Sequence, residues 1–205
     1  MKKFMALLLV AGMTLSLTAC GGSNDTAKTD QADGKDTFTV GFDQDFPPFG
    51  YVGDDGEFTG FDIEMATECA ARMGKKIVLQ PIDWDAKDME LEAGTIDCIW
   101  NGFTMNGRED QYTWTDPYMD NSQVVVVKKD SGINTLADLA GKVVEVQKES
   151  AAETALNDEE HADLMASFAQ LLSVGEYNTA FMDLESGAVD AVAIDIGVAQ
   201  FQIEG

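Results

Sequence analysis

The chain has 205 residues, and its 37 Asp and Glu outnumber its 13 Lys and Arg, which gives a formal net charge of −24 at pH 7. So large an acidic excess makes nucleic acid an unfavourable partner, and it repels an anionic membrane surface. There is one histidine, His161, and no acidic ligand motif of recognised spacing accompanies it. A zinc site or a Ser-His triad therefore has no support, and we expect no cofactor and no bound metal.

The first residues have the pattern of an export signal. Lys2 and Lys3 precede an apolar run that is too short to span a bilayer as a stable helix. The run ends in Leu17-Thr18-Ala19-Cys20, which is similar to the bacterial lipobox, where the cysteine becomes the new N-terminus and carries acyl chains. We expect a signal peptide over residues 1–19, then a lipidated Cys20 and a flexible tether over residues 20–36, a segment too polar to fold. An ordinary cleavage site beside an unrelated cysteine is the alternative.

Strand and helix patterns alternate after the tether. A strand ending at Phe42 precedes a helix, a strand and a second helix, which we place at residues 61–73, 77–82 and 84–94. Asp54-Asp55-Gly56 has the composition of a hairpin turn. The β-branched run at residues 124–127 is suited to a strand that crosses into the second half. There a short helix, a strand and a helix follow, at residues 136–139, 142–146 and 151–156.

The chain also repeats itself at a fixed offset. Residues 89–99 match residues 182–192, and in each copy a helical pattern stops at a glycine, Gly94 or Gly187, before an apolar run that fits a buried strand. The alternation in both halves predicts an α/β fold of two lobes, each a mostly parallel sheet flanked by helices. We place lobe 1 at residues 37–123 and lobe 2 at residues 124–205.

The two cysteines beyond Cys20 have no spacing signature. Cys69 falls in a helical pattern and Cys98 in a strand pattern, so both fit small buried residues. A bridge between them stays open in an oxidising compartment.

The loops after the strands are where a ligand is expected, because small molecules bind beyond the carboxyl ends of strands in open α/β sheets. The loop after Phe42 contains Asp43, Phe46 and Phe49, and Pro47-Pro48 stiffens it. Either phenylalanine would cover a ligand. The alternative is that both rings only pack the loop onto its own lobe.

The loop after Trp100 runs from Asn101 to Arg108. Gly102 lets a ligand approach the backbone, Thr104 offers a hydroxyl, and Arg108 offers a planar guanidinium that matches a carboxylate. In so acidic a chain, a surface ion pair of Arg108 is the alternative.

Two further loops belong to the second half. Ser150 stands where a helix N-cap would, with Glu153 three residues later as in a capping box, and the free amides there favour an anion. A role of Ser150 as a cap alone is the alternative. Asp195 opens the last helix, either as its N-cap or as an acceptor for an ammonium group.

These motifs together resemble a known family. The lipobox, the Asp-x-x-Phe-x-Pro-Phe loop, Gly-x-Thr followed by Arg108, Thr115-Asp-Pro-Tyr118 and the segment 189–195 look like the polar amino acid branch of the bacterial family 3 extracellular solute-binding proteins. The resemblance implies the two-lobed periplasmic-binding-protein type II fold, a free amino acid as ligand and the permease of an ABC importer as partner. No nucleophile paired with a base is visible in the sequence, so we expect binding without chemistry and not an enzyme. We also expect a monomer that is exported and held by lipid on the outer face of the cell membrane, or periplasmic.

The resemblance also implies roles by position. Arg108, Thr104, Ser150 and the backbone at Gly102 resemble a carboxylate clamp, while Asp195 resembles the ammonium acceptor. Phe46 resembles an aromatic lid, with Asp43 close to the side-chain pocket, which Trp84 shapes unless it packs in the core. The expected ligand contacts are Asp43, Phe46, Trp84, Asn101, Gly102, Thr104, Arg108, Ser150 and Asp195. The sequence does not identify the amino acid.

The chain departs from the family pattern in three places. The loop that ends at Arg108 is shorter than usual, and Glu149 stands where the family has a glycine. Family members also continue beyond the position of Gly205 into the first lobe, so we expect a C-terminally truncated chain whose lobe 1 lacks its closing segment. Two alternatives stay open: an enzyme on the same fold, such as a cyclohexadienyl dehydratase-like protein, and the sensing domain of a receptor.

Overall fold

The computed structural model describes residues 35–204. The predicted signal peptide, Cys20 and the tether up to residue 34 lie outside the described residues. The strands are β1 (Thr37–Phe42), β2 (Asp45–Phe46), β3 (Gly50–Val52), β4 (Phe58–Thr59), β5 (Lys76–Pro81), β6 (Cys98–Ile99), β7 (Gln123–Val127), β8 (Val143–Gln147), β9 (Gln170–Val174) and β10 (Ala191–Asp195). The α-helices are α1 (Phe61–Arg72), α2 (Lys87–Ala93), α3 (Ala151–Leu156), α4 (Ala162–Ser167), α5 (Tyr177–Ser186) and α6 (Ile196–Glu204). Short 3-10 helices are η1 (Trp84–Ala86), η2 (Leu136–Leu139) and η3 (Glu159–His161). Within residues 35–204, no helix is long and apolar enough to cross a membrane.

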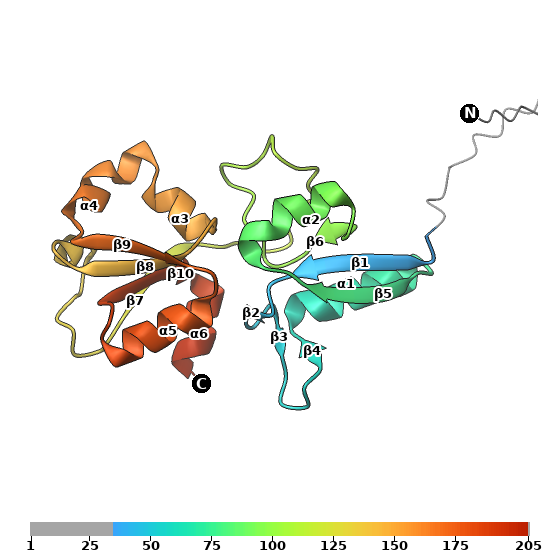
Figure 1. Ribbon diagram of the computed structural model, residues 1–205, viewed down its shortest axis with the longest axis horizontal. Helices are drawn as coiled ribbons and strands as arrows, with labels where there is room; N and C mark the ends of the chain where they lie inside the picture. Colours follow the sequence, from blue (N-terminus) through green and yellow to red (C-terminus); the bar gives the residue numbers. More distant parts are fainter. Residues whose placement is uncertain (1–34, 205) are drawn as a thin grey trace, which may run out of the picture. The chain divides into compact units, whose positions relative to one another are not determined.

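The first lobe is built on a small parallel sheet with the strand order β5-β1-β6. β1 pairs with β5 along its whole length and with β6 at two positions only. α1 packs along this sheet (Figure 1) and buries Ile63, Ala66 and Ala70, whose spacing places them on one helix face. Gly60 precedes α1 with a φ of 125°, and a Cβ there would lie 2.4 Å from the carbonyl oxygen of Phe49. A glycine is therefore required where the helix begins.

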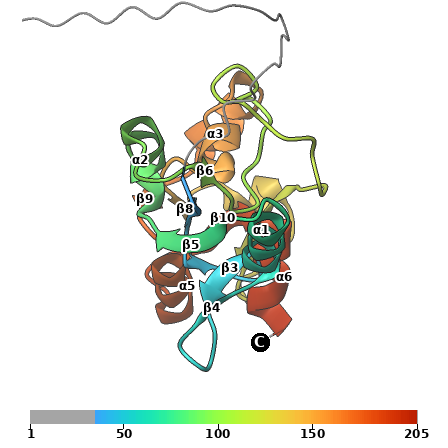
Figure 2. The same cartoon turned by 90° about the vertical axis from the view of Figure 1, so that its right-hand side faces the viewer.

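The predicted hairpin turn is confirmed. β2, β3 and β4 form a small antiparallel sheet, and the β3–β4 connection extends away from α1 in both views (Figures 1 and 2). The Gly53 N–H donates to the Glu57 carbonyl at 2.8 Å, and Gly56 turns the chain with a φ of 83°. Glycine adopts such a left-handed conformation without steric cost.

The second lobe is built on a four-stranded sheet with the order β7-β10-β8-β9. β10, β8 and β9 run parallel, while β7, the predicted crossing strand, pairs antiparallel with β10 and places Gln123 opposite Asp195. α3 and α4 cover one face of the sheet, and α5 and α6 cover the other (Figure 1). All five residues of β10 are buried, as expected for a central strand covered on both faces. The structure thus has the predicted fold class, while the lobe boundary between residues 123 and 124 stays a prediction.

The internal repeat is a repeat of structure as well as of sequence. Gly94 ends α2 with a φ of 69° and Gly187 ends α5 with a φ of 84°, so both are left-handed helix caps before a strand. The prediction of one helix over residues 84–94 is wrong in detail. The segment divides into η1 and α2, because Ala86, with φ −100° and ψ −1°, departs from regular α-helical torsions.

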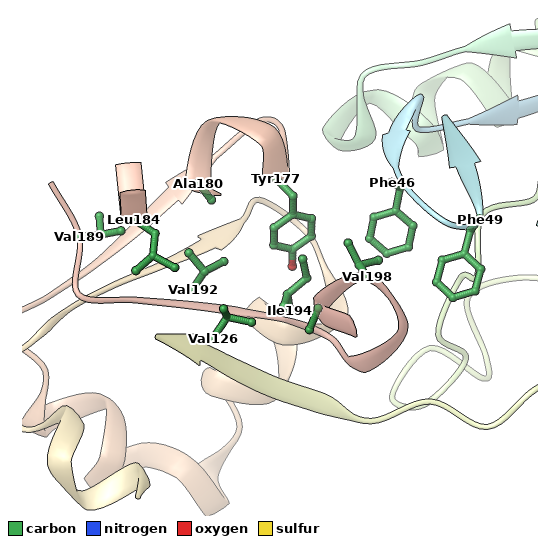
Figure 3. Packing of buried hydrophobic residues seen from close by; sticks show 11 residues of the cluster. Phe46, Phe49, Val126, Tyr177, Ala180, Leu184, Val189, Val192, Ile194 and Val198 are labelled. Atoms are coloured by element: carbon green, nitrogen blue, oxygen red, sulfur yellow. The ribbon is translucent and has the colours of Figure 1, made fainter. Parts of the chain in front are cut away.

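Two buried apolar clusters lie on either side of the second sheet. One contains Leu139, Val144, Val146 and Ala152. The other includes Phe46 and Phe49 of the first lobe beside Tyr177 and Val198 of the second (Figure 3). The alternative that these two rings pack only onto their own lobe is therefore wrong. Gly197 permits this contact, since a Cβ there would lie 2.8 Å from Cζ of Phe49.

Candidate functional site

One small cavity collects most of the residues expected to hold a ligand. Its volume is about 20 Å³, which is room for roughly one water molecule. The lining residues are Phe46, Trp84, Asn101, Gly102, Phe103, Thr104, Arg108, Gln147, Ser150, Ala151 and Asp195. Of the expected ligand contacts, the lining contains all except Asp43. Their role as ligand contacts stays a prediction.

Arg108 is the one cation of this lining, and it is 7% exposed. Its Nη1 donates to the Thr104 carbonyl at 3.2 Å, and its Nη2 donates to the Glu149 carbonyl at 3.1 Å and to the Thr154 hydroxyl at 3.0 Å. All three acceptors are neutral, and Arg108 forms no ion pair within residues 35–204. The alternative of a surface ion pair is therefore wrong. Since a guanidinium has five N–H groups, two remain to donate to a ligand.

An aromatic cluster holds the loop that carries Arg108. The Phe103 ring stands edge-on to Trp84, with ring centres 5.1 Å apart, and its centre lies 5.0 Å from that of Trp114. The Arg108 guanidinium lies 5.2 Å from the centre of the Phe103 ring. The Trp114 indole N–H donates to the Arg108 carbonyl at 3.1 Å. Residues 100–122 form no helix or strand, so these side chains position Arg108 in place of regular structure.

A second brace joins the same loop to α1. The Gly102 N–H donates to the Tyr118 hydroxyl at 3.2 Å, and that hydroxyl donates to Asp62 Oδ1 at 2.9 Å. Asp62 is 1% exposed, and burial raises the pKa of its carboxyl from 3.8 to about 6, against the opposing effect of the Tyr118 hydrogen bond. The Gly102 N–H is thus engaged within the protein, and Gly102 lines the cavity with its remaining atoms.

Asp195 supplies a carboxylate to the same cavity from the end of β10. Its Oδ1 accepts hydrogen bonds from the side-chain amides of Asn121 and Gln123, the latter at 2.7 Å. Asn121 also donates to the Thr104 hydroxyl at 3.0 Å. Burial raises the pKa of Asp195, and the two amides oppose that rise. Because both amides donate to Oδ1, Oδ2 is the oxygen that can accept a hydrogen bond from a ligand.

Ser150 caps α3, as predicted, since its Oγ accepts the Glu153 N–H at 3.1 Å. The reciprocal half of the predicted capping box is wrong. The Glu153 carboxylate accepts the N–H of Glu149, because the Ser150 N–H already donates to the Gln147 carbonyl at 3.2 Å. α3 is only six residues long, so its dipole adds little, and a contribution of Ser150 to the site rests on its hydroxyl.

Asp43 lies behind the cavity wall. Its carboxylate accepts the Gln147 amide at 2.7 Å and the Asp45 N–H at 2.8 Å, and its own N–H donates to Asn101 Oδ1 at 2.9 Å. Burial raises the pKa of Asp43 to about 6. Asp43 thus positions two lining residues, Gln147 and Asn101, from behind.

Sequence reasoning missed three lining residues, namely Phe103, Gln147 and Ala151. Gln147 had a signal that could have found it, because it is the first polar residue at the carboxyl end of β8. Phe103 had one too, because it stands between Gly102 and Thr104 in the loop predicted to hold the ligand. Within residues 35–204 no group of three or more metal-ligating side chains gathers, and Cys69 and Cys98 are half-buried free thiols. Burial raises the pKa of Cys98 to about 12.

Comparison with known proteins gives the class. Residues 38–181 match the family described as bacterial extracellular solute-binding proteins, family 3. The chain belongs to this family, as the sequence motifs predicted. The family's description and the names of its relatives are those of binding proteins, in line with the expected class.

Individual relatives carry more specific names. The arginine-binding extracellular protein ArtP of Bacillus subtilis is 37% identical over 72% of this chain and 56% of its own length. The L-cystine-binding protein TcyJ of Escherichia coli is 31% identical over 93% of this chain and 69% of its own length. The crystal structure of an ABC uptake transporter substrate-binding protein from Streptococcus pneumoniae with bound histidine aligns with a TM-score of 0.78 and 36% identity, covering 82% of this chain and 70% of that one. The chain thus spans little more than half the length of ArtP.

Proposed function

We propose that this protein binds a free amino acid at the cavity between its lobes and delivers it to the permease of an ABC importer. Arg108 holds the α-carboxylate, with Thr104 and Ser150 beside it. Asp195 accepts the α-ammonium group, and Phe46 and Trp84 enclose the side chain. Binding involves no chemical step.

One observation carries the proposal: a buried cation and a buried anion line the same cavity without being paired to each other. Arg108 and Asp195 are 7% and 5% exposed, and Arg108 forms no ion pair within residues 35–204. A buried charge is costly unless it is paired. A zwitterion satisfies both charges at once, and the two unused N–H groups of Arg108 and Asp195 Oδ2 are available to it.

Entry of an amino acid requires the walls to separate. The cavity volume of about 20 Å³ accommodates roughly one water molecule, and an amino acid is larger. The walls belong to different lobes, since Arg108 and Trp84 follow strands of the first sheet, whereas Ser150 follows β8 and Asp195 ends β10 of the second. Opening and closing of the lobes around the amino acid is therefore part of the proposal.

The remaining parts of the proposed function concern where the protein works. Export and a lipid anchor at Cys20 are supported by the apolar N-terminal run and the lipobox-like segment. The name of the Streptococcus pneumoniae neighbour supports an ABC uptake transporter as the partner. We propose that the protein acts as a monomer on the outer face of the cell membrane or in the periplasm.

The test is a panel of free amino acids, including arginine, cystine and histidine. Each is added to the purified protein in a thermal-shift measurement, and those that raise the melting temperature are titrated calorimetrically. A ligand at about 100 times its dissociation constant stabilises the folded state by about 2.7 kcal/mol. We expect one or a few amino acids to bind with a stoichiometry of one. No binding across the panel, together with turnover of prephenate or arogenate, would contradict the proposal and support the enzyme alternative.

A further inference from the structure

Lys87, a residue that the proposed function does not use, is buried with its charge. It opens α2, its side chain is 3% exposed, and its Nζ lies 2.8 Å from Glu149 Oε2 and 5.2 Å from the centre of the Trp84 ring. Lysine is almost never buried so fully unless it is paired. A positive charge at the start of a helix is also disfavoured by the helix dipole. The partner, Glu149, must therefore account for the position of Lys87.

Glu149 has an unusual backbone. It is the one non-glycine residue within residues 35–204 with a positive φ, at 58°. For such a residue the left-handed conformation is sterically unfavourable, and it persists only where the surroundings hold it. Three contacts do so here: Lys87 binds the side chain, Glu153 accepts the Glu149 N–H, and Arg108 donates to the Glu149 carbonyl at 3.1 Å.

We propose that Glu149 is a positioning residue for the amino acid site, because its carboxylate neutralises the buried Lys87 when the lobes close, a proposal that rests on the proposed function. Lys87 belongs to the first lobe and Glu149 follows β8 of the second, so the pair exists only where the lobes meet. The carboxylate of Glu149 neutralises Lys87 in the closed arrangement, while Glu153 and Arg108 bond to the Glu149 backbone. Closure around an amino acid, and hence its retention, depends on the carboxylate of Glu149.

The two partners are not equivalent, and this asymmetry makes the proposal testable. Glu149 is 44% exposed in its side chain, so water can solvate it when Lys87 is removed. Lys87 is buried, and removal of its partner leaves an uncompensated charge in the closed arrangement. Loss of the Glu149 charge should therefore open the lobes, whereas replacement of Lys87 by an apolar side chain of similar length should not.

The first experiment measures association and dissociation rates of the amino acid that the wild-type protein binds, tried in the order arginine, histidine and cystine. Because the pair forms after encounter, we expect Glu149→Gln to raise the dissociation rate about tenfold or more and to leave the association rate within about twofold. Lys87→Met should change the dissociation rate less than about threefold. The double variant, Lys87→Met with Glu149→Gln, should have a dissociation rate close to that of Lys87→Met alone. An unchanged dissociation rate in Glu149→Gln, or no rescue in the double variant, would overturn the proposal.

A matched control comes from the neighbouring ion pair. Lys148 Nζ lies 2.7 Å from Asp85 Oδ2 and also joins the two lobes, but the side chains are 53% and 35% exposed. Exposed pairs contribute little, so Asp85→Asn, which changes the net charge by the same +1 as Glu149→Gln, should alter the dissociation rate less than about twofold. A change as large as that in Glu149→Gln would assign the effect to net charge and overturn the proposal.

The second experiment does not depend on amino acid binding. Acetylation of lysine amines by a succinimidyl ester, followed by mass spectrometry, is carried out with and without the amino acid panel. We expect Lys87 to be protected relative to Lys148, and Glu149→Gln to abolish the protection. Equal reactivity of Lys87 and Lys148 under every condition would overturn the proposal, whether or not an amino acid binds. If Lys87 is protected although no amino acid binds, the result would support the ion pair between Lys87 and Glu149, and it would contradict only the proposed function.

Discussion

The two charged side chains of the cavity stand on different supports. Arg108 lies in a segment without regular structure, residues 100–122, and is held by aromatic rings, by Tyr118 and by polar contacts across the lobes. Asp195 ends β10, a fully buried strand with neighbours on both sides and helices on both faces. The comparison indicates that the Arg108 wall can adjust in the proposed closure of the lobes, while the Asp195 wall is fixed by the sheet.

The largest effect expected from this difference is on binding. A ligand carboxylate that loses its charged partner keeps its desolvation cost, so Arg108→Ala should weaken amino acid binding by roughly 2–5 kcal/mol. The free energy of unfolding of the ligand-free protein should fall by less, because Arg108 lies on a loop outside the sheets. Arg108→Lys should recover only part of the loss, since an ammonium cannot reproduce the planar guanidinium. Calorimetric titration and chemical denaturation of the three proteins would measure both quantities.

If Arg108→Ala leaves the affinity unchanged and lowers only the free energy of unfolding, the result would contradict the binding role proposed for the Arg108 wall. It would make Arg108 a structural link between the Phe103 cluster and the Glu149 carbonyl.

The brace behind the Arg108 wall should respond to pH. The folded-state pKa of Asp62 is raised from 3.8 to about 6, so the folded protein holds this proton in a pH range in which the unfolded chain has released it. The stability contributed by Asp62 therefore falls as the pH rises from about 4 to about 6. Asp62→Asn should raise the free energy of unfolding at pH 7 by roughly 1–3 kcal/mol, and the gain should vanish near pH 4. Denaturation curves across this pH range would test it.

Asp138→Asn is the matched control for that measurement. Hydrogen bonds from the Asn134 N–H, and then from Thr135, lower the pKa of Asp138, which is the opposite direction. This variant should therefore give no gain in stability at pH 7. A gain in both variants would show that relief of the overall negative charge, and not burial of Asp62, is responsible.

The walls also differ in how far the sequence could predict them. Apolar patterns in the sequence predicted strands that end at or near Phe42, Trp100 and Ile194. The rule that ligands bind beyond strand ends then placed Arg108 and Asp195 at one site. The contacts that hold Arg108 could not be predicted. Phe103, Tyr118 and Glu149 come from separate segments, and periodicity carries no information on which side chains meet across two lobes.

A smaller effect, on the free energy of unfolding alone, should distinguish the buried strand β10 from the exposed hairpin. Ile194 is fully buried beside Asp195, so Ile194→Val, which removes one methylene group, should lower the free energy of unfolding by roughly 0.5–1.5 kcal/mol. Val52→Ala, at a 46% exposed position of the hairpin, should cost less, because its side chain is already largely solvated. Urea denaturation of both variants would check this, and equal losses would contradict the close packing assigned to β10.

The most direct measurement of the central claim pairs Asp195→Asn with two ligands: the amino acid found in the panel and its analogue without the α-amino group. Only the amino acid leaves an ammonium without its counter-charge, so its binding should weaken by roughly 2–5 kcal/mol, while binding of the analogue to the two proteins should differ by less than about 0.5 kcal/mol. Equal losses for both ligands would contradict the claim that Asp195 receives the α-ammonium group, and would leave it the end of a strand and nothing more.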